Sequence, residues 1–307
     1  MKADIVVGGF KIAFENPFSI PVTKHTGFVA FMDILGYSNI HHIDANIAGL
    51  ILGLMDSVLS MKNDAIQAID PREDLDSIEA QATSESFINS MQHWQTLFKD
   101  RISIALISDS ILCVANMDDL SDEEDMRFVM DAYIATLSRI ITYMFGDGLP
   151  LRGGITYGDF YPNRSLSENP SAFLGPAILE AHKLECLSNT ACVYFDDHAA
   201  EKCLLHCSHN REDSNIQDWA DLCQSKVTMR PASNEIEIVR DALCINIQNM
   251  RPWLGKERKK VEWAFKAFNK WPKDKEAIEK VSQKLENTVR FLTERQQVGT
   301  LCNQSVS

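Results

Sequence analysis

Short apolar runs alternate along the chain with longer stretches in which apolar residues recur at helical spacing. Residues 28–33, Phe-Val-Ala-Phe-Met-Asp, form an apolar run that ends in a carboxylate and predicts a buried strand. Residues 43–61 have a helical period and predict a core helix; its longest apolar run, 47–55, is too short to span a bilayer. The mixed polar stretch 62–95 predicts a loop with further helix.

A predicted hairpin and a predicted helix follow. Two apolar runs within residues 102–115 flank Ser108 and Asp109, which predicts a β-hairpin with Asp109 at its tip. The next predicted helix covers about residues 124–145. Ser121 and Glu124 stand at the spacing of a capping box before it, and Gly146 ends it.

The pattern then returns to strands and one further helix. Residues 151–158, Leu-Arg-Gly-Gly-Ile-Thr-Tyr-Gly, predict a strand whose glycines lie where another segment approaches the backbone closely. We expect a loop over 159–172, a helix over 175–187 and a strand over 192–195. The order strand–helix–strand–strand–helix–strand–helix–strand indicates an α+β or α/β sandwich with a mixed sheet.

The chain changes character after Pro252. Basic residues outnumber acidic ones between 256 and 295, in contrast to the rest of the sequence. Apolar residues at helical spacing predict an amphipathic helix after Pro272: Ile278, Val281, Leu285, Val289 and Leu292. Packing of this helix against the core or a partner subunit is favoured over membrane or nucleic-acid binding, because acids are interleaved with the bases. We therefore divide the chain into an N-terminal segment (1–25), a main domain (26–250) and a helical C-terminal extension (251–307).

Charge and cysteine usage narrow the function. The formal net charge of −13 argues against a broad basic surface that binds nucleic acid. A phosphate-bearing ligand would therefore have to be bound by a few local cationic side chains together with metal ions. Eight cysteines form no regular framework and follow no signal-peptide pattern, which predicts the cytoplasm and no membrane anchor. The group Cys203, His206, Cys207 and His209 is too tightly spaced for a two-pair zinc site, so ordinary helix residues are the favoured interpretation.

Asp33 and Asp109 are the candidate metal ligands. Each follows an apolar run at the end of a predicted strand, so both could face one cavity. Mg²⁺ and Mn²⁺ prefer oxygen ligands and bind through one or two carboxylates together with substrate phosphates. Two strand-end aspartates alone are more often turn or capping residues. Their interpretation as metal ligands therefore depends on the surrounding sequence.

That surrounding sequence resembles the class III nucleotidyl cyclases in four places. Residues 31–37, Phe-Met-Asp-Ile-Leu-Gly-Tyr, and residues 107–112, Ile-Ser-Asp-Ser-Ile-Leu, resemble the two metal motifs of that family. Residues 152–158, Arg-Gly-Gly-Ile-Thr-Tyr-Gly, resemble a cyclase strand, and residues 175–185 resemble the helix that carries catalytic polar residues. The motifs occur in the family's order.

The resemblance implies a ferredoxin-like catalytic core and a head-to-tail homodimer with active sites at the interface. It implies two Mg²⁺ or Mn²⁺ ions held by Asp33 and Asp109, with the carbonyl of Ile34 as a further ligand. The ribose 3′-oxygen of a nucleoside triphosphate would attack the α-phosphate and release pyrophosphate.

Two further positions are implied less directly. Lys183 stands where the family has a transition-state arginine on the opposite subunit, and Leu179 replaces the family's ribose-binding asparagine. Arg152 fits phosphate binding and a structural ion pair equally well.

The identity of the base rests on missing residues. The usual purine-reading positions hold Ala105 and Ala172, which cannot hydrogen-bond to a base. Phe31 and Tyr37 offer aromatic faces on which a base could stack, although core packing explains them equally well.

The residues of these motifs are most similar to those of the pyrimidine cyclases of bacterial Pycsar anti-phage systems. This implies UTP, or less favourably CTP, as substrate, and a separate effector activated by the cyclic nucleotide. Three alternatives stay open: a degenerate cyclase domain that only binds a nucleotide, a purine cyclase, and a dinucleotide cyclase of the same fold.

Overall fold

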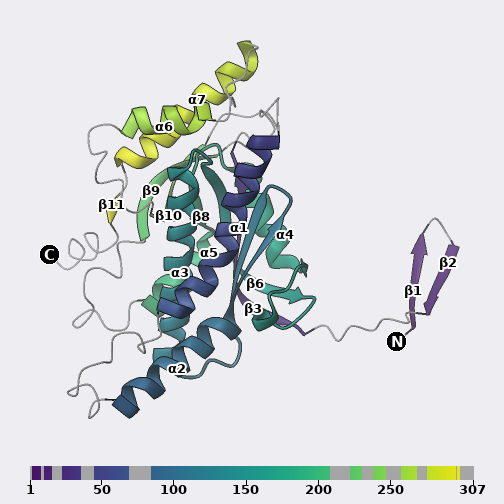
Figure 1. The fold of residues 1–307 in the computed structure, drawn as a ribbon. Coiled ribbons are helices and arrows are strands. Elements are labelled where there is room, and N and C mark those ends of the chain that lie inside the picture. Colours follow the sequence, from purple (N-terminus) through teal and green to yellow (C-terminus); the bar gives the residue numbers. More distant parts are fainter. Residues whose placement is uncertain are drawn as a thin grey trace.

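The computed structural model describes ten stretches of the chain, and all structural statements below concern them: residues 2–7, 10–15, 23–35, 45–68, 84–207, 222–229, 238–246, 257–267, 275–294 and 296–297. Strands β1 (Lys2–Val7) and β2 (Phe10–Glu15) pair with each other as an antiparallel hairpin. Figure 1 shows this hairpin apart from the main body.

One mixed sheet organises the main body. Its strands, in chain order, are β3 (His25–Ile34), β4 (Ile102–Ile107), β5 (Ser110–Asn116), β6 (Leu151–Pro162), β8 (Val193–Phe195), β9 (Leu222–Met229), β10 (Ile238–Ile245) and β11 (Gln296–Gln297). In space they follow the order β11-β9-β10-β8-β6-β3-β5-β4, and the short β7 (Phe173–Leu174) pairs with β6. The pair β6–β8 is parallel and every other pairing described is antiparallel.

Four of these strands carry the predicted topology. β3, β4, β5 and β6 stand in the spatial order β6-β3-β5-β4, with helices between β3 and β4 and between β5 and β6. This is the β-α-β-β-α-β arrangement of ferredoxin-like folds. The predicted α+β class with a mixed sheet flanked by helices is therefore confirmed.

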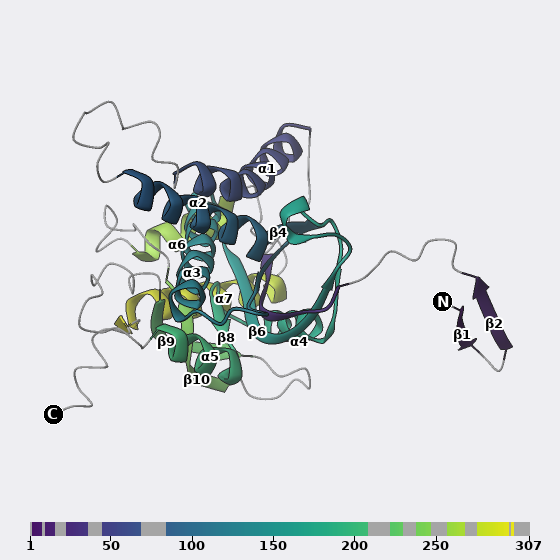
Figure 2. The ribbon, with the colours of Figure 1, turned by 90° about the horizontal axis from the view of Figure 1, so that it is seen from below.

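Helices cover both faces of the sheet (Figure 2). They are α1 (Ala45–Ala68), α2 (Ser84–Arg101), α3 (Glu123–Gly146), α4 (Pro176–Leu187), α5 (Asp197–Cys207), α6 (Glu257–Lys266) and α7 (Lys275–Glu294). Side chains of α1, α2, α3 and α5 pack into the larger hydrophobic core, whereas α4 packs into a smaller cluster on the opposite face. Of the described helices, α3 alone is long and apolar enough to cross a bilayer, and 61% of that stretch is buried in the protein.

Strand β3 separates the two hydrophobic clusters. Phe28, Ala30 and Met32 point into the larger core, and the intervening Val29 and Phe31 point into the smaller cluster below α4. Successive side chains of a strand alternate between faces, so a strand that is buried on both sides appears in the sequence as one continuous apolar run. By the same alternation, the side chain of Asp33 belongs to the α4 face.

Two sequence-based boundaries were wrong. The N-cap of α3 is Asp122 rather than Ser121; its carboxylate accepts a 2.8 Å hydrogen bond from the backbone N–H of Glu124. A carboxylate at this position both caps the first turn and interacts favourably with the helix dipole. The predicted loop 159–172 begins as strand, because β6 keeps pairing with β3 as far as Phe160 and then pairs with β7. It also contains a short 3₁₀ helix, Leu166–Glu168.

Helix α7 packs against the sheet, as its amphipathic pattern predicted. Its residues Leu285, Phe291 and Leu292 are part of the larger core. The hydroxyl of Thr288 accepts a hydrogen bond from the backbone N–H of Ala191 at 3.0 Å, which ties the helix to the segment before β8. The division of the chain at residues 250 and 251 stays a prediction, although α7 and the sheet share one core.

Candidate functional site

The sheet brings Asp33 and the β4–β5 turn together. In the antiparallel register, Asp33 lies opposite Ser110 on β5 and opposite Arg152 on β6. The hydroxyl of Ser110 donates a 3.3 Å hydrogen bond to Oδ1 of Asp33. Asp109 precedes Ser110 in a two-residue turn that begins with Ser108 in a left-handed conformation, φ 59°. Asp109 is therefore at the hairpin tip, as predicted, one residue from the partner of Asp33.

Arg152 lies between two carboxylates. Its Nη2 is 3.5 Å from Oδ2 of Asp33, and its Nε is 2.6 Å from Oε1 of Glu185 on α4. Its Nη1 also donates a 3.4 Å hydrogen bond to the carbonyl of Ser188. Of the two interpretations of Arg152, the structure shows the ion pair. A contact with phosphate stays a prediction.

The electrostatic environment of Asp33 favours a cation. Burial raises the pKa of Asp33, and the carboxylates of Glu185 and Asp109 raise it further, against the opposing effect of Arg152. A half-buried carboxylate among other carboxylates is a site where positive charge is stabilising. Oxygen donors of this kind fit Mg²⁺ or Mn²⁺, so the residues present suit the predicted ions. The backbone of Ile34, the third predicted ligand, pairs with Leu151 at the buried end of β3.

Close packing of α4 positions Glu185. A Cβ added to Gly154 on β6 would overlap the Cβ of Leu184 and lie 2.9 Å from the carbonyl oxygen of Ala181, so only glycine lets the helix come this near. The hydroxyl of Tyr194 donates a 2.8 Å hydrogen bond to the carbonyl of Leu184 and holds the end of the helix. The side chain of Glu185 is only 4% exposed as a result.

Sequence reasoning missed Glu185 as a site residue. The buried face of α4 consists of Ala177, Ala181 and Glu185, which are spaced four residues apart. A carboxylate in register with two small apolar residues on a packed helix face needs a buried partner, since burial of an unpaired charge is costly. That spacing was the signal in the sequence.

Phe31 and Tyr37 are the aromatic residues predicted to stack on a base, and the structure describes only Phe31. The ring of Phe31 stacks on the imidazole of His182, with centroids 4.9 Å apart and ring planes 5° from parallel. One face of Phe31 is therefore occupied by the protein, and stacking of a base on this ring stays untested. Tyr37 lies outside the described residues.

Lys183 and Leu179 lie on the outer face of α4. The side chain of Lys183 is 67% exposed and forms a 2.5 Å ion pair with Glu180, and Leu179 is 63% exposed. Lys183 thus points to solvent, away from the buried face of its own helix. The predicted contact from Lys183 to a substrate in the opposite subunit is untested.

The two alanines that replace purine-reading residues differ in environment. Ala105 on β4 is buried in the smaller cluster, whereas Ala172 is exposed just before β7. Of the tightly spaced group before residue 210, Cys203 is fully buried in the larger core, and His209 lies outside the described residues.

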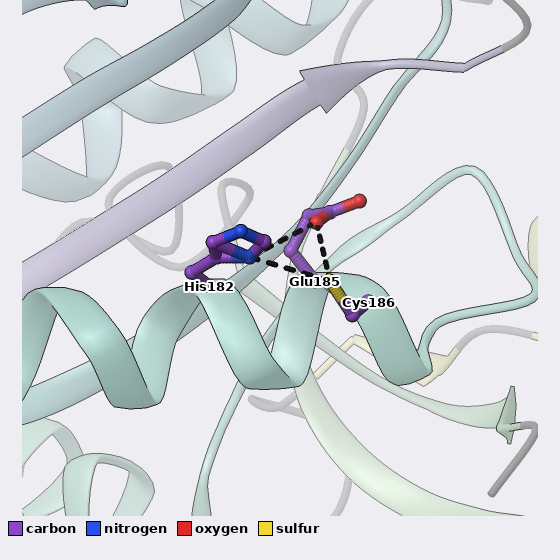
Figure 3. A group of neighbouring side chains, drawn as sticks. All are labelled: His182, Glu185 and Cys186. Atoms are coloured by element: carbon purple, nitrogen blue, oxygen red, sulfur yellow. Dashed lines mark hydrogen bonds and ion pairs between the residues drawn. The ribbon is translucent and has the colours of Figure 1, made fainter. Parts of the chain in front are cut away.

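A further group of polar side chains lies on α4, close to the Glu185–Arg152 pair. Cys186 Sγ is 3.3 Å from Nδ1 of His182 and 3.4 Å from Oε2 of Glu185. His182 Nδ1 is 3.6 Å from the same Oε2. Figure 3 shows the three side chains converging from consecutive turns of the helix. Burial, followed by the Glu185 carboxylate, raises the pKa of the Cys186 thiol to about 11.

Three solved structures of nucleotide cyclases show limited similarity to this chain. No protein-family model and no curated protein matches the chain. A bacterial light-regulated adenylyl cyclase is 16% identical with a TM-score of 0.41, and the match covers 76% of this chain and 54%, about half, of that one. The catalytic core of a rhodopsin-guanylyl cyclase with converted specificity is 11% identical with a TM-score of 0.41, covering 74% and 98% of the two chains. The adenylyl cyclase CyaB from P. aeruginosa is 12% identical with a TM-score of 0.36, covering 74% and 97%.

Proposed function

We propose that the chain is a nucleotide cyclase that converts UTP, or less favourably CTP, to the 3′,5′-cyclic nucleotide and pyrophosphate. The observation that carries the proposal is the register of β3 and β5. It pairs Asp33 with Ser110, the residue that follows Asp109. The candidate metal ligands of the two motifs therefore lie near each other at one end of the sheet.

Asp33, Asp109 and the carbonyl of Ile34 would hold the two divalent cations. When bound, such ions neutralise triphosphate charge and favour ionisation of the ribose hydroxyl. Ser110 and Arg152 orient the Asp33 carboxylate through one oxygen each. In the reaction, the bond from the 3′-oxygen to the α-phosphorus forms and the bond from that phosphorus to the bridging oxygen breaks. The hydroxyl proton passes to solvent and pyrophosphate leaves.

A homodimer with shared sites is part of the proposal. Lys183 lies on the exposed face of α4 and would offset charge on the phosphate bound by the partner subunit. Leu179, one turn away on the same helix, and Leu174 on β7 are 63% and 76% exposed, and these apolar side chains would be covered by a second copy.

Pyrimidine specificity rests on what the site lacks. Ala105 is buried on β4 and offers a base no donor or acceptor from its side chain. We propose that the cyclic pyrimidine product acts in the cytoplasm as a second messenger for a separate effector in defence against phage.

The test is incubation of the purified protein with Mn²⁺ and each of the four nucleoside triphosphates, with products identified by mass spectrometry. Asp33→Asn and Asp109→Asn should abolish the product. Asp197→Asn, which changes an aspartate with a 96% exposed side chain on α5, is the matched control and should retain activity. A cyclic purine product would refute the pyrimidine assignment and leave the cyclase.

One observation favours a second candidate, a nucleotide-binding domain without catalysis. The guanidinium of Arg152 already lies 3.5 Å from Asp33, where it supplies positive charge without a metal. This candidate predicts binding of a nucleoside triphosphate by calorimetry without pyrophosphate release. Pyrophosphate release that is lost in Asp33→Asn would exclude it.

A further inference from the structure

We propose that His182, Glu185 and Cys186 form a binding site for a transition metal ion of the Zn²⁺ class on helix α4 (Figure 3). Within the described part of the chain, this is the one group of three histidine, cysteine or acidic side chains whose ligand atoms all lie within 4.8 Å of one another. The inference concerns a second ion of different chemistry and does not depend on the proposed cyclase reaction.

The distances between the three ligand atoms match those around a tetrahedral zinc ion. Zn–S bonds of about 2.3 Å and Zn–N or Zn–O bonds of about 2.0–2.2 Å, at tetrahedral angles, separate the ligand atoms by about 3.4–3.6 Å. The observed separations are 3.3 Å from Sγ to Nδ1, 3.4 Å from Sγ to Oε2 and 3.6 Å from Nδ1 to Oε2. One ion can therefore contact all three atoms with little rearrangement of the side chains.

Neighbouring residues already orient two of the ligands. Arg152 holds Oε1 of Glu185 at 2.6 Å, so the other oxygen, Oε2, is the one turned toward His182 and Cys186. The ring of Phe31 stacks on the imidazole of His182 and fixes its plane, while the ring nitrogens stay at the edge. Residues around a metal site that hold its ligands in this way strengthen binding.

The location allows an ion to enter from solvent. The side chain of His182 is 52% exposed and Cys186 is exposed, whereas Glu185 forms the buried wall of the group. Three protein ligands leave a fourth tetrahedral position open for water or another small ligand. Thiolate and imidazole ligands select Zn²⁺ or Co²⁺ over Mg²⁺ and Mn²⁺, which separates this site chemically from the oxygen donors of Asp33 and Asp109.

The test uses Co²⁺ as a spectroscopic probe on the full chain after treatment with a chelator. We expect one equivalent of Co²⁺ to produce a sulfur-to-cobalt charge-transfer band and intense visible bands of tetrahedral cobalt, and Zn²⁺ to remove both. Millimolar Mg²⁺ should leave them unchanged. Absence of the charge-transfer band would overturn the proposal.

Variants locate the ion. Cys186→Ser should abolish the charge-transfer band, and His182→Ala should weaken Co²⁺ binding by more than about tenfold, the lower range for changes around metal ligands. Cys207→Ser, which removes a cysteine of the other zinc-like group, is the matched control and should leave the spectrum unchanged. A band that persists in Cys186→Ser, or that is lost in Cys207→Ser, would place the ion elsewhere and refute the site.

A second measurement uses the unchanged protein, so it does not depend on whether a variant folds. Alkylation of Cys186 by iodoacetamide, followed by peptide mass spectrometry, should slow when Zn²⁺ is present, because the bound sulfur is no longer free to react. Equal labelling with and without Zn²⁺ would contradict the proposal. Neither readout requires a nucleotide, so absence of cyclase activity and absence of this site are separate results.

Discussion

Two glycines on β6 provide a matched test of how α4 is held. Gly154 and Gly158 are four residues apart on the same strand, so both face α4, and neither has a positive φ. A Cβ at Gly154 would overlap Leu184 and approach the backbone of α4. A Cβ at Gly158 would meet only the Cβ of Ala177, at 3.5 Å, which is an ordinary contact.

The magnitudes follow from these contacts. Gly154→Ala places a methyl group against helix backbone that cannot rotate away, and overpacking of this kind costs about 1–3 kcal/mol. Gly158→Ala fits without strain and should stabilise the protein by about 0.4–1 kcal/mol, because alanine restricts the unfolded chain. The free energies of unfolding of the two variants should therefore differ by about 1.5–4 kcal/mol in favour of Gly158→Ala.

The assay is thermal unfolding of both variants beside the unchanged protein, together with the proposed cyclase activity. One kcal/mol corresponds to about 2–4 °C in domains of 150–250 residues, so the melting temperatures of the variants should differ by at least about 3 °C. Gly154→Ala should also lower activity, because outward movement of α4 separates Glu185 from Arg152. If Gly154→Ala melts at or above the temperature of Gly158→Ala, the close approach of α4 to β6 is wrong.

Three further predictions address single side chains. The raised pKa of Asp33 means that the folded state favours the protonated carboxyl group, so the charged carboxylate is destabilising. The stability that this group contributes is present at low pH and is lost as pH rises through the folded-state pKa. Asp33→Asn should therefore melt no lower than the unchanged protein at pH 7 while forming no product, and a clear loss of stability would contradict this. Burial lowers the pKa of Lys62 from 10.5 to about 8, because the folded state favours the neutral amine. The stability of the protein is therefore not reduced by Lys62 above pH 10.5, and it falls as the pH is lowered through about 8. Between pH 7 and 10 the unchanged protein should gain up to about 3 kcal/mol relative to Lys62→Met, and parallel stability curves would refute that. Tyr194→Phe removes the hydrogen bond to the carbonyl of Leu184 and should lower stability by about 1 kcal/mol in urea unfolding; no shift of the midpoint would show that the bond contributes nothing.

Local patterns were sufficient to predict the strands and helices nearest the site. The run at 28–33 is continuous because β3 is buried on both faces, and the two residues between β4 and β5 suit only a tight turn. The strand pair β9–β10 escaped prediction. Positions 223–227 of β9 alternate between buried and exposed, but one of the buried side chains is the polar Ser225, so the sequence shows no clear apolar–polar alternation.

The arrangement of the site depended on contacts between distant segments. The sequence placed Asp33 and Asp109 at strand ends, but only the register shows that Arg152 lies opposite Asp33. The contact between Arg152 and Glu185 depends further on the docking of α4 over Gly154. Neither register nor docking distance is encoded by spacing along one segment, because each is set by packing across the sheet.

The late position of α7 in the chain has a consequence for synthesis on the ribosome. The segment before β8 uses the Thr288 hydroxyl as acceptor for the N–H of Ala191, and the larger core includes Phe291. A nascent chain that has produced β3, the β4–β5 hairpin and α4 therefore still lacks a hydrogen-bond partner and part of its apolar core. The segment before β8 and the larger core therefore reach their final packing only after residue 292 has left the exit tunnel, later than the emergence of β3, the β4–β5 hairpin and α4.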